Sequence, residues 1–284
     1  MKIFIPNESK QTVGGGFTFV RNFTKYAKKS GAEVITGQCC PVDADIFFIA
    51  GATMVTREKV EEAKRFGKKI VLRVDNAPRN SRNRNTGTSR LKSFADIADL
   101  IVYQSQWARE YLMPFLGKDG VVILNGADEE IFNMAGPKQP REAEQQYLYV
   151  QYNRDESKRW HEAWYRFSML ARKNSDSHLW IVGNFSPENL AYGFDFFMGE
   201  RFRYAGVLDR PEDLAEYYRG ADMLFLPYYN DACSNVMVEA RLSGVPSIIH
   251  NGTGGNEEIM QAPLEYLLAS RMALRYVAEF AKLL

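Results

Sequence analysis

Short apolar segments alternate with longer segments of helical period along most of this chain. In the first half, the short runs are rich in β-branched and aromatic residues, which is typical of buried strands, and the longer ones repeat apolar residues at helical spacing. The expected strands are Lys2–Pro6, Glu33–Thr36, Ile46–Ala50, Ile70–Val74, Leu100–Gln104 and Val121–Leu124, and the expected helices are Phe17–Lys29, Thr56–Phe66, Ser93–Asp99 and Gln106–Phe115. This alternation predicts a parallel sheet with helices on both faces.

The alternation stops at Ala135–Pro140 and then starts again. This stretch contains two prolines and one glycine, which is typical of a linker. Beyond it, the expected strands are Gln146–Gln151, Leu179–Val182, Phe202–Ala205, Met223–Pro227 and Pro246–His250, and the expected helices are Lys158–Arg172, Pro211–Arg219, Ser234–Leu242 and Asn256–Gln261. The sequence therefore predicts an α/β protein with two doubly wound, Rossmann-like parallel-sheet domains that face a cleft.

The 284 residues agree with two domains of roughly 100–200 residues each. We expect a first domain over residues 1–136 and a second over residues 141–263. Residues 264–284 form an apolar-rich helical segment, which we expect to pack on a domain and which is long enough to cross back to the first. A helix on a membrane surface is the alternative, but it would need more Lys and Arg on its polar face.

Composition excludes several classes of protein. No run of 18 apolar residues predicts a transmembrane helix, and the polar run after the first strand comes too soon for a signal peptide, so we expect a cytoplasmic protein. Three cysteines fit neither a disulfide framework nor a zinc site. The net charge of +1 excludes a strongly electrostatic nucleic-acid binder, although residues 1–140 carry 21 basic and 15 acidic residues (+6) and the remainder 15 and 20 (−5).

In open parallel sheets, ligands bind beyond the carboxyl ends of the strands. A candidate motif is therefore expected to bind a ligand only if it lies at that edge. Gly14–Gly16 opens the first helix, where glycines let a ligand approach the backbone and the helix N-terminus attracts anions; a flexible turn is the alternative. It is no dinucleotide fingerprint, because residue 19 is Phe where the third glycine would stand.

The motif Asp43-Ala-Asp45 precedes its strand, so we expect a solvated loop rather than a metal site.

Arg73 and Asp75 end the fourth expected strand and so lie at the ligand edge. Asp75 is placed to orient a sugar hydroxyl or a catalytic group. The segment Asn76–Arg90 has Ala77 as its one aliphatic residue and is expected to be a loop outside the core. It carries Arg79, Arg82, Arg84 and Arg90. It is either a solvated loop or a loop that faces the cleft and binds an anionic acceptor or a diphosphate, because guanidinium groups match phosphate oxygens.

Basic residues follow the first strand of the second half. Arg154 and Lys158 come directly before an expected helix, and two cations at this place suit a diphosphate.

A second cluster follows the strand Met223–Pro227. Asp231 lies just before a helix and Glu239 about two turns inside it, and carboxylates accept hydrogen bonds from the paired hydroxyls of a ribose or hexose. The first backbone N–H groups of this helix would face an anion; they belong to Ser234, Asn235 and Val236. An N-cap aspartate followed by an ordinary helix glutamate is the alternative.

Together these motifs resemble the retaining GT-B glycosyltransferases of family four, the group 1 glycosyl transferases. The second half carries Asp231 and Glu239, then an Ala-x-x-x-Gly-x-Pro turn, and then Gly254–Glu258. The other segments that match the family are Arg73–Asp75, Ala98–Ser105, Leu124–Asp128 with Phe132, Phe202–Gly206, Ala221–Asp222 and Leu226–Pro227. The resemblance spans Gly14 to about Glu258 and depends on the order and spacing of these motifs.

The resemblance assigns roles residue by residue. It implies that Glu239 holds the donor ribose and that Asp231 holds the hydroxyls of the transferred sugar, where the family usually has the longer glutamate. It implies that Arg154 and Lys158 stabilise the diphosphate leaving group. Four further donor contacts are implied, at Gly15 and Gly16 near the phosphates and at Val207 and Leu208, whose backbone would contact the base.

The resemblance also implies an activity. It implies a retaining, metal-independent, hexosyltransferase-like enzyme that moves a sugar from a nucleoside-diphosphate sugar, such as a UDP- or GDP-sugar, to an acceptor hydroxyl. The acceptor, bound by the first domain, would be a glycan, a lipid-linked glycan or a small molecule. No cofactor and no nucleic-acid partner is expected, and peripheral membrane contact stays open. A nucleotide-sugar epimerase of GT-B fold and a non-catalytic partner subunit are the alternatives.

Overall fold

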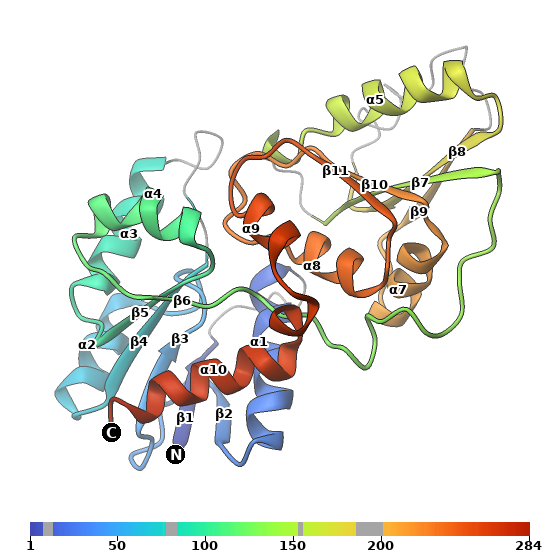
Figure 1. The fold of residues 1–284 in the computed structure, drawn as a ribbon. Coiled ribbons are helices and arrows are strands. Elements are labelled where there is room, and N and C mark those ends of the chain that lie inside the picture. The colour runs from blue at the N-terminus through green and yellow to red at the C-terminus, as the bar shows by residue number, and fades with distance from the viewer. Residues whose placement is uncertain (8–13, 76, 78–83, 153–155, 186–200) are drawn as a thin grey trace.

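The computed structural model describes residues 1–7, 14–75, 77, 84–152, 156–185 and 201–284 (Figure 1). The first part of the chain forms a six-stranded sheet in the order β2-β1-β3-β4-β5-β6. All its neighbouring strands pair in parallel. Its strands are β1 (Lys2–Pro6), β2 (Glu33–Gly37), β3 (Ile46–Ile49), β4 (Lys69–Val74), β5 (Leu100–Tyr103) and β6 (Val121–Val122).

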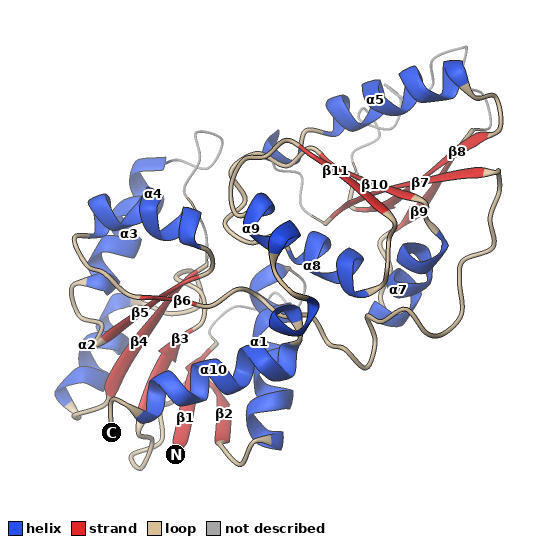
Figure 2. Cartoon of the chain, in the orientation of Figure 1, coloured by secondary structure: helices blue, strands red, loops and turns tan. Residues whose placement is uncertain are grey.

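The second part forms a separate five-stranded parallel sheet in the order β11-β10-β7-β8-β9. Its strands are β7 (Gln145–Gln151), β8 (Ser177–Gly183), β9 (Phe202–Gly206), β10 (Met223–Leu226) and β11 (Ser247–His250). Two parallel sheets, each covered by helices, confirm the predicted α/β class with two Rossmann-like domains (Figure 2).

Helices cover both faces of each sheet. In the first domain α1 (Gly15–Lys29) lies on one face, and α2 (Arg57–Arg65), α3 (Arg84–Ala95) and α4 (Gln106–Leu116) lie on the other. In the second, α5 (Trp160–Lys173) lies on one face, and α7 (Pro211–Gly220) and α8 (Asn235–Leu242) lie on the other (Figure 2). The 3-10 turn η2 (Glu156–Lys158) precedes α5, and the chain ends with α9 (Asn256–Gln261), the 3-10 turn η3 (Leu264–Leu267) and α10 (Ala269–Ala281).

The helix α3 corrects one prediction. Asn76–Arg90 was expected to be a loop and the helix to run from Ser93 to Asp99, whereas the helix already begins at Arg84 and ends at Ala95. Leu91 and Phe94 are buried in the same apolar cluster as the strands of the first sheet. This tertiary burial stabilises a helix whose first turns are polar, and apolar periodicity cannot indicate helical residues that have no apolar side chain.

The C-terminal helix packs on the first domain, where α10 lies beside α1 (Figure 1). Tyr276 and Phe280 are buried among Phe19, Phe23 and Phe48, which belong to α1 and β3. The ring centroids of Phe48 and Phe280 lie 5.1 Å apart, and those of Phe19 and Tyr276 lie 5.4 Å apart. The helix α10 therefore contributes side chains to the hydrophobic core of the first domain.

The chain crosses between the domains twice, and the two crossing segments lie side by side. Ala127 N donates to Leu267 O at 3.0 Å, and Ala269 N donates to Ala127 O at 2.9 Å. At Gly126 a Cβ atom would lie 2.5 Å from Leu268 O, so the close approach requires glycine. The two crossings form one paired junction between the domains.

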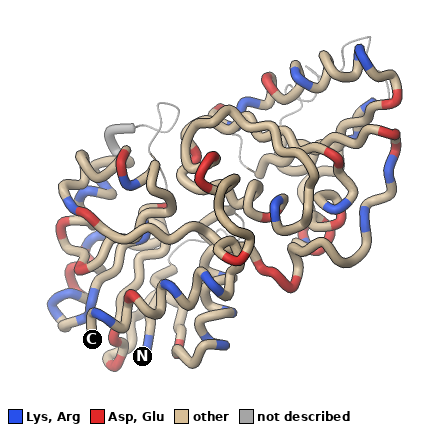
Figure 3. Tube along the Cα trace, in the orientation of Figure 1, with Lys and Arg blue, Asp and Glu red and all other residues tan. Residues whose placement is uncertain are grey.

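Basic and acidic positions are interspersed over both domains (Figure 3). Among the described residues, none of the helices combines the length and the apolar composition that a bilayer crossing requires.

Candidate active site

The carboxyl ends of β7 and β10 bring together two of the residues that the sequence singled out. Lys158 ends η2 after β7, and Asp231 lies in the loop after β10. Lys158 Nζ lies 2.8 Å from Asp231 Oδ2, and the two side chains are only 12% and 17% exposed. Lys158 Nζ also lies 3.6 Å from the centroid of the Tyr228 ring. A largely buried cation and a largely buried carboxylate therefore meet at the ligand edge of the second sheet.

Glu239 lies one turn before the end of α8, with its residue 7% exposed. Tyr218 Oη donates to its Oε2 atom at 3.1 Å. Burial raises the pKa of the Glu239 carboxyl to about 8, against the opposing effects of the Tyr218 hydrogen bond and of the positive charge of Arg21. Arg21 belongs to α1, so a charge of the first domain acts on a carboxyl of the second. A buried carboxyl with a raised pKa is typical of functional sites.

The start of α8 lies against the glycine loop of the first domain. Ser234 caps α8, and its Oγ atom accepts a hydrogen bond from Met237 N. Asn235 Nδ2 donates to Gly15 O at 3.4 Å. Gly14, at the start of α1, has a φ of 132°, a conformation that side chains rarely allow. The two segments that were expected to face phosphates, one in each domain, are therefore in contact.

A second glycine loop packs against the Asp231 segment. A Cβ atom at Gly254 would lie 2.2 Å from Asp231 O, and Gly255 N donates to the same oxygen at 2.9 Å. The next residue, Asn256, is fully buried, and neither atom of its amide has a hydrogen-bond partner among the described residues.

Val207 and Leu208, expected to contact the base, follow β9 in the second domain. Val207 is 47% exposed, and Leu208 packs partly against the core of this domain. Burial raises the pKa of the Tyr152 phenol, and the negative charges of Glu239 and Asp209 raise it further.

In the first domain, Asp75 lies beside the turn that follows β3. Its Oδ1 atom lies 3.4 Å from Ala52 N. Arg73 is 2% exposed, with Nη1 donating to Ala50 O at 2.8 Å and Nη2 to Asn125 Oδ1 at 3.0 Å. The guanidinium of Arg73 is therefore held inside the protein by partners of its own chain.

Three of the arginines predicted to bind ligands, Arg79, Arg82 and Arg154, lie outside the described residues. Arg84 is described only as the first residue of α3. Their roles stay predictions.

Asn125 is a central residue of the site that sequence reasoning missed. It lies between the two domains, 3% exposed, and its Nδ2 atom is 2.9 Å from Asn235 Oδ1. It stands beside a glycine within the Leu124–Asp128 segment that matches the family, and this is the signal that could have drawn attention to it.

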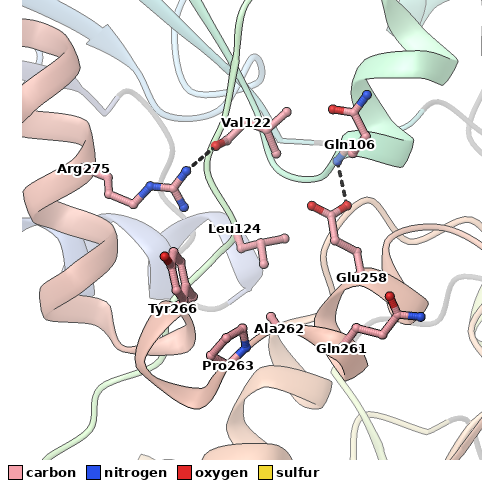
Figure 4. Close-up of a pocket in the computed structure, with 9 residues that line it drawn as sticks. All are labelled: Gln106, Val122, Leu124, Glu258, Gln261, Ala262, Pro263, Tyr266 and Arg275. Carbon is pink, nitrogen blue, oxygen red and sulfur yellow. Dashed lines mark hydrogen bonds between the residues drawn. The ribbon is translucent and has the colours of Figure 1, made fainter.

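An open groove of about 440 Å³ lies elsewhere, at the β6 edge of the first sheet (Figure 4). Its lining residues are Gln106, Val122, Leu124, Glu258, Gln261, Ala262, Pro263, Tyr266 and Arg275. In Figure 4 Arg275 Nη2 donates to Val122 O at 2.7 Å, and Gln106 N donates to Glu258 Oε2 at 2.7 Å. None of these residues was predicted to bind the donor.

In the described part of the chain, no three His, Cys, Asp or Glu side chains group as metal ligands would.

Two Rossmann-like domains that meet at the carboxyl ends of their strands define the GT-B fold, and the solved structures agree. A sucrose-phosphate synthase from Thermosynechococcus elongatus is 14% identical, with a TM-score of 0.73 over 99% of this chain and 98% of that one. HepE from Anabaena, solved in complex with UDP-glucose, is 13% identical, with a TM-score of 0.67 over 100% and 99%. The lipopolysaccharide outer core galactosyltransferase WaaB is 16% identical, with a TM-score of 0.62 over 93% and 84%.

A family model also matches part of the sequence. Residues 148–284 match the family model described as "Glycosyl transferases group 1". The match covers 137 of the 284 residues, and together with the solved structures it supports a glycosyltransferase. The search of curated proteins returned no match.

Proposed function

We propose that the protein is a retaining, metal-independent glycosyltransferase that moves a sugar from a nucleoside-diphosphate sugar to an acceptor hydroxyl. The observation that carries the proposal is the ion pair of Lys158 and Asp231, 2.8 Å apart beside the start of α8. This pair supports the proposal because a cation of the kind that binds a diphosphate and a carboxylate of the kind that binds sugar hydroxyls lie together, and Asp231 comes shortly before α8 in the sequence. Glu239 lies inside the same helix with a carboxyl suited to the ribose hydroxyls.

The reaction follows from these groups. The bond between the anomeric carbon and the diphosphate oxygen breaks through an oxocarbenium-like transition state, and negative charge grows on the diphosphate. Lys158, together with Arg154 and the N–H groups of Ser234, Asn235 and Val236, stabilises this charge. The acceptor hydroxyl forms its new bond on the face that the diphosphate leaves, and its proton passes to the leaving diphosphate. The anomeric configuration is thereby retained.

Donor binding rearranges the ion pair. In the free protein Asp231 neutralises Lys158, whereas in the complex Asp231 accepts hydrogen bonds from the sugar and Lys158 turns to the diphosphate. Val207 and Leu208 contact the base through their backbone. The complex of HepE with UDP-glucose supports UDP-glucose as the first donor to test.

The first domain binds the acceptor, a glycan, a lipid-linked glycan or a small molecule. In this proposal Asp75 orients the reacting groups, and the positive charges of Arg79, Arg82 and Arg84 attract an anionic acceptor.

The variant Lys158→Ala tests the proposal. Because one contact to the developing charge contributes about a hundredfold or more in rate, we expect UDP release from UDP-glucose, with water as acceptor, to fall by about that factor. The rate should be unchanged by EDTA. The control Lys173→Ala removes an exposed lysine at the end of α5 and should leave the rate unchanged.

Equal rates for Lys158→Ala and the wild type would remove the leaving-group role. Loss of activity in EDTA would contradict metal independence, and an inverted product in the NMR spectrum of a transfer reaction would contradict retention. Absence of binding to UDP-, GDP-, ADP- and CMP-sugars, measured by thermal shift, would favour a non-catalytic partner subunit.

A further inference from the structure

One buried amide links the two domains at the start of α8. Asn125 Nδ2 lies 2.9 Å from Gln104 Oε1 in the first domain. In the second domain it lies 3.1 Å from Cys233 O and 2.9 Å from Asn235 Oδ1. The backbone N–H of Asn125 also points to Cys233 Sγ at 3.3 Å. Asn125 therefore contacts both the loop that leads into α8 and the first residue of that helix.

The first domain determines which way this amide points. Arg73 Nη2 donates to Asn125 Oδ1 at 3.0 Å, and a guanidinium can only donate. Arg73 is itself held by Ala50 O at 2.8 Å and lies 3.8 Å from the centroid of the Phe19 ring. Because Oδ1 must face Arg73, Nδ2 must face the opposite side, where Gln104, Cys233 and Asn235 lie.

The contact continues through Asn235 to the glycine loop. Asn235 Oδ1 accepts from Asn125, while Asn235 Nδ2 donates to Gly15 O at 3.4 Å. The chain of contacts from Arg73 through Asn125 and Asn235 to Gly15 thus joins the start of α8 to the glycine loop. The proposed function puts the start of α8 at the diphosphate, and the resemblance implies that the glycine loop lies near the phosphates as well.

We propose that Asn125 is a positioning residue, which fixes the start of α8 against the Gly14–Gly16 loop so that the two domains present one geometry to the diphosphate. This inference rests on the proposed function. In this proposal Asn125 does not contact the substrate. The side chain of Asn235 holds the start of α8 in place, whereas its backbone N–H faces the diphosphate. A misplacement of about 1 Å is enough to cost about a hundredfold in rate, so the loss of this link should affect turnover.

The test compares turnover with nucleotide binding. We expect Asn125→Ala and Asn235→Ala to lower UDP release from UDP-glucose by about tenfold or more. The dissociation constant for UDP, measured by calorimetry, should stay within about threefold, because Lys158 and Glu239 lie wholly in the second domain. The control is Asn133→Ala, whose side chain bonds to the backbone of Glu129, Glu130 and Ala135.

A double variant distinguishes one shared link from two separate effects. Asn125 and Asn235 act in the same chain of contacts, so Asn125→Ala combined with Asn235→Ala should be no slower than the slower single variant, within about twofold. Multiplied losses, or full activity in either single variant, would overturn the proposal.

Hydrogen exchange tests the link without catalysis. We expect the amides of Gly15–Thr18 to exchange faster in ligand-free Asn235→Ala than in the wild type, because Gly15 O loses its partner from α8. Asn235 is only half-buried, so this variant should fold even if Asn125→Ala does not. Unchanged exchange would overturn the link. If the wild type binds no nucleotide sugar but the exchange still differs, the proposed function fails while the contact stands.

Discussion

At the scale of single residues, the protonation of Glu239 makes the free energy of unfolding depend on pH. Burial raises the pKa of its carboxyl from 4.5 to about 8. Between these two values, the folded protein holds a proton that the unfolded chain has lost. The stabilising contribution is therefore fully present below about pH 4.5, and it is lost as the pH rises through about 8.

The variant Glu239→Gln should remove this dependence. At about pH 8.5 we expect it to be more stable than the wild type by a few kcal/mol, because each unit of pKa shift corresponds to about 1.4 kcal/mol. Near pH 4 both proteins carry a neutral side chain and should be equally stable. Urea denaturation at several pH values measures the free energy of unfolding. Glu257→Gln, at an exposed residue of α9, is the control. A pH-independent difference for Glu239→Gln would refute the raised pKa.

At the scale of elements, the N-terminus of α4 is completed by residues of both domains. Ser105 Oγ accepts from Ala108 N at 3.0 Å. Glu258, on α9 of the second domain, accepts from Gln106 N at 2.7 Å (Figure 4). A carboxylate at this end also interacts favourably with the helix dipole. The helix α4 of the first domain is thus capped in part by Glu258 of the second domain.

We expect Glu258→Ala to lower the free energy of unfolding by about 1 kcal/mol, the usual cost of losing a cap. The measurement is made near pH 8, because burial raises the pKa of the Glu258 carboxyl and the cap is strongest when ionised. Glu257→Ala is the matched control, since Glu257 lies on the same helix and bonds to Gln261 at the surface. Equal losses in both variants would show that the cap contributes nothing.

The elements also show where sequence patterns succeed. The predicted strands agree closely with those observed; β1, for example, spans Lys2–Pro6 as expected. Parallel strands buried on both faces are continuous apolar runs, which are readily seen in a sequence. The start of α3 at Arg84 was not predicted, because the stabilising contacts of that helix come from Leu91 and Phe94, about two and three turns further along.

At the scale of the whole molecule, α10 makes the two ends of the chain interdependent. Phe280 is fully buried, with its ring centroid 6.2 Å from that of Phe23 on α1 and 5.1 Å from that of Phe48 on β3. The first domain therefore needs residues that follow the second domain in the sequence.

We expect Phe280→Ala to lower the free energy of unfolding by about 3–5 kcal/mol, because it leaves a cavity in an aromatic cluster. Leu274→Ala, on the same helix but 47% exposed, should cost about 1 kcal/mol or less. Urea denaturation measures both, and hydrogen exchange should rise in α1 and β3. Faster exchange confined to the second domain would contradict this account.

The sequence by itself determined the periodic elements, and through them the α/β class and the ligand edge where Lys158 and Asp231 were expected. Apolar periodicity is a local property, and the rule for ligands in parallel sheets needs only the end of each strand. Only the tertiary structure decided that Arg73 is buried, that Asn125 joins the domains and that Glu258 caps α4. The partners in these contacts lie up to 152 residues apart, and no local pattern of side chains records which distant backbone group each will meet.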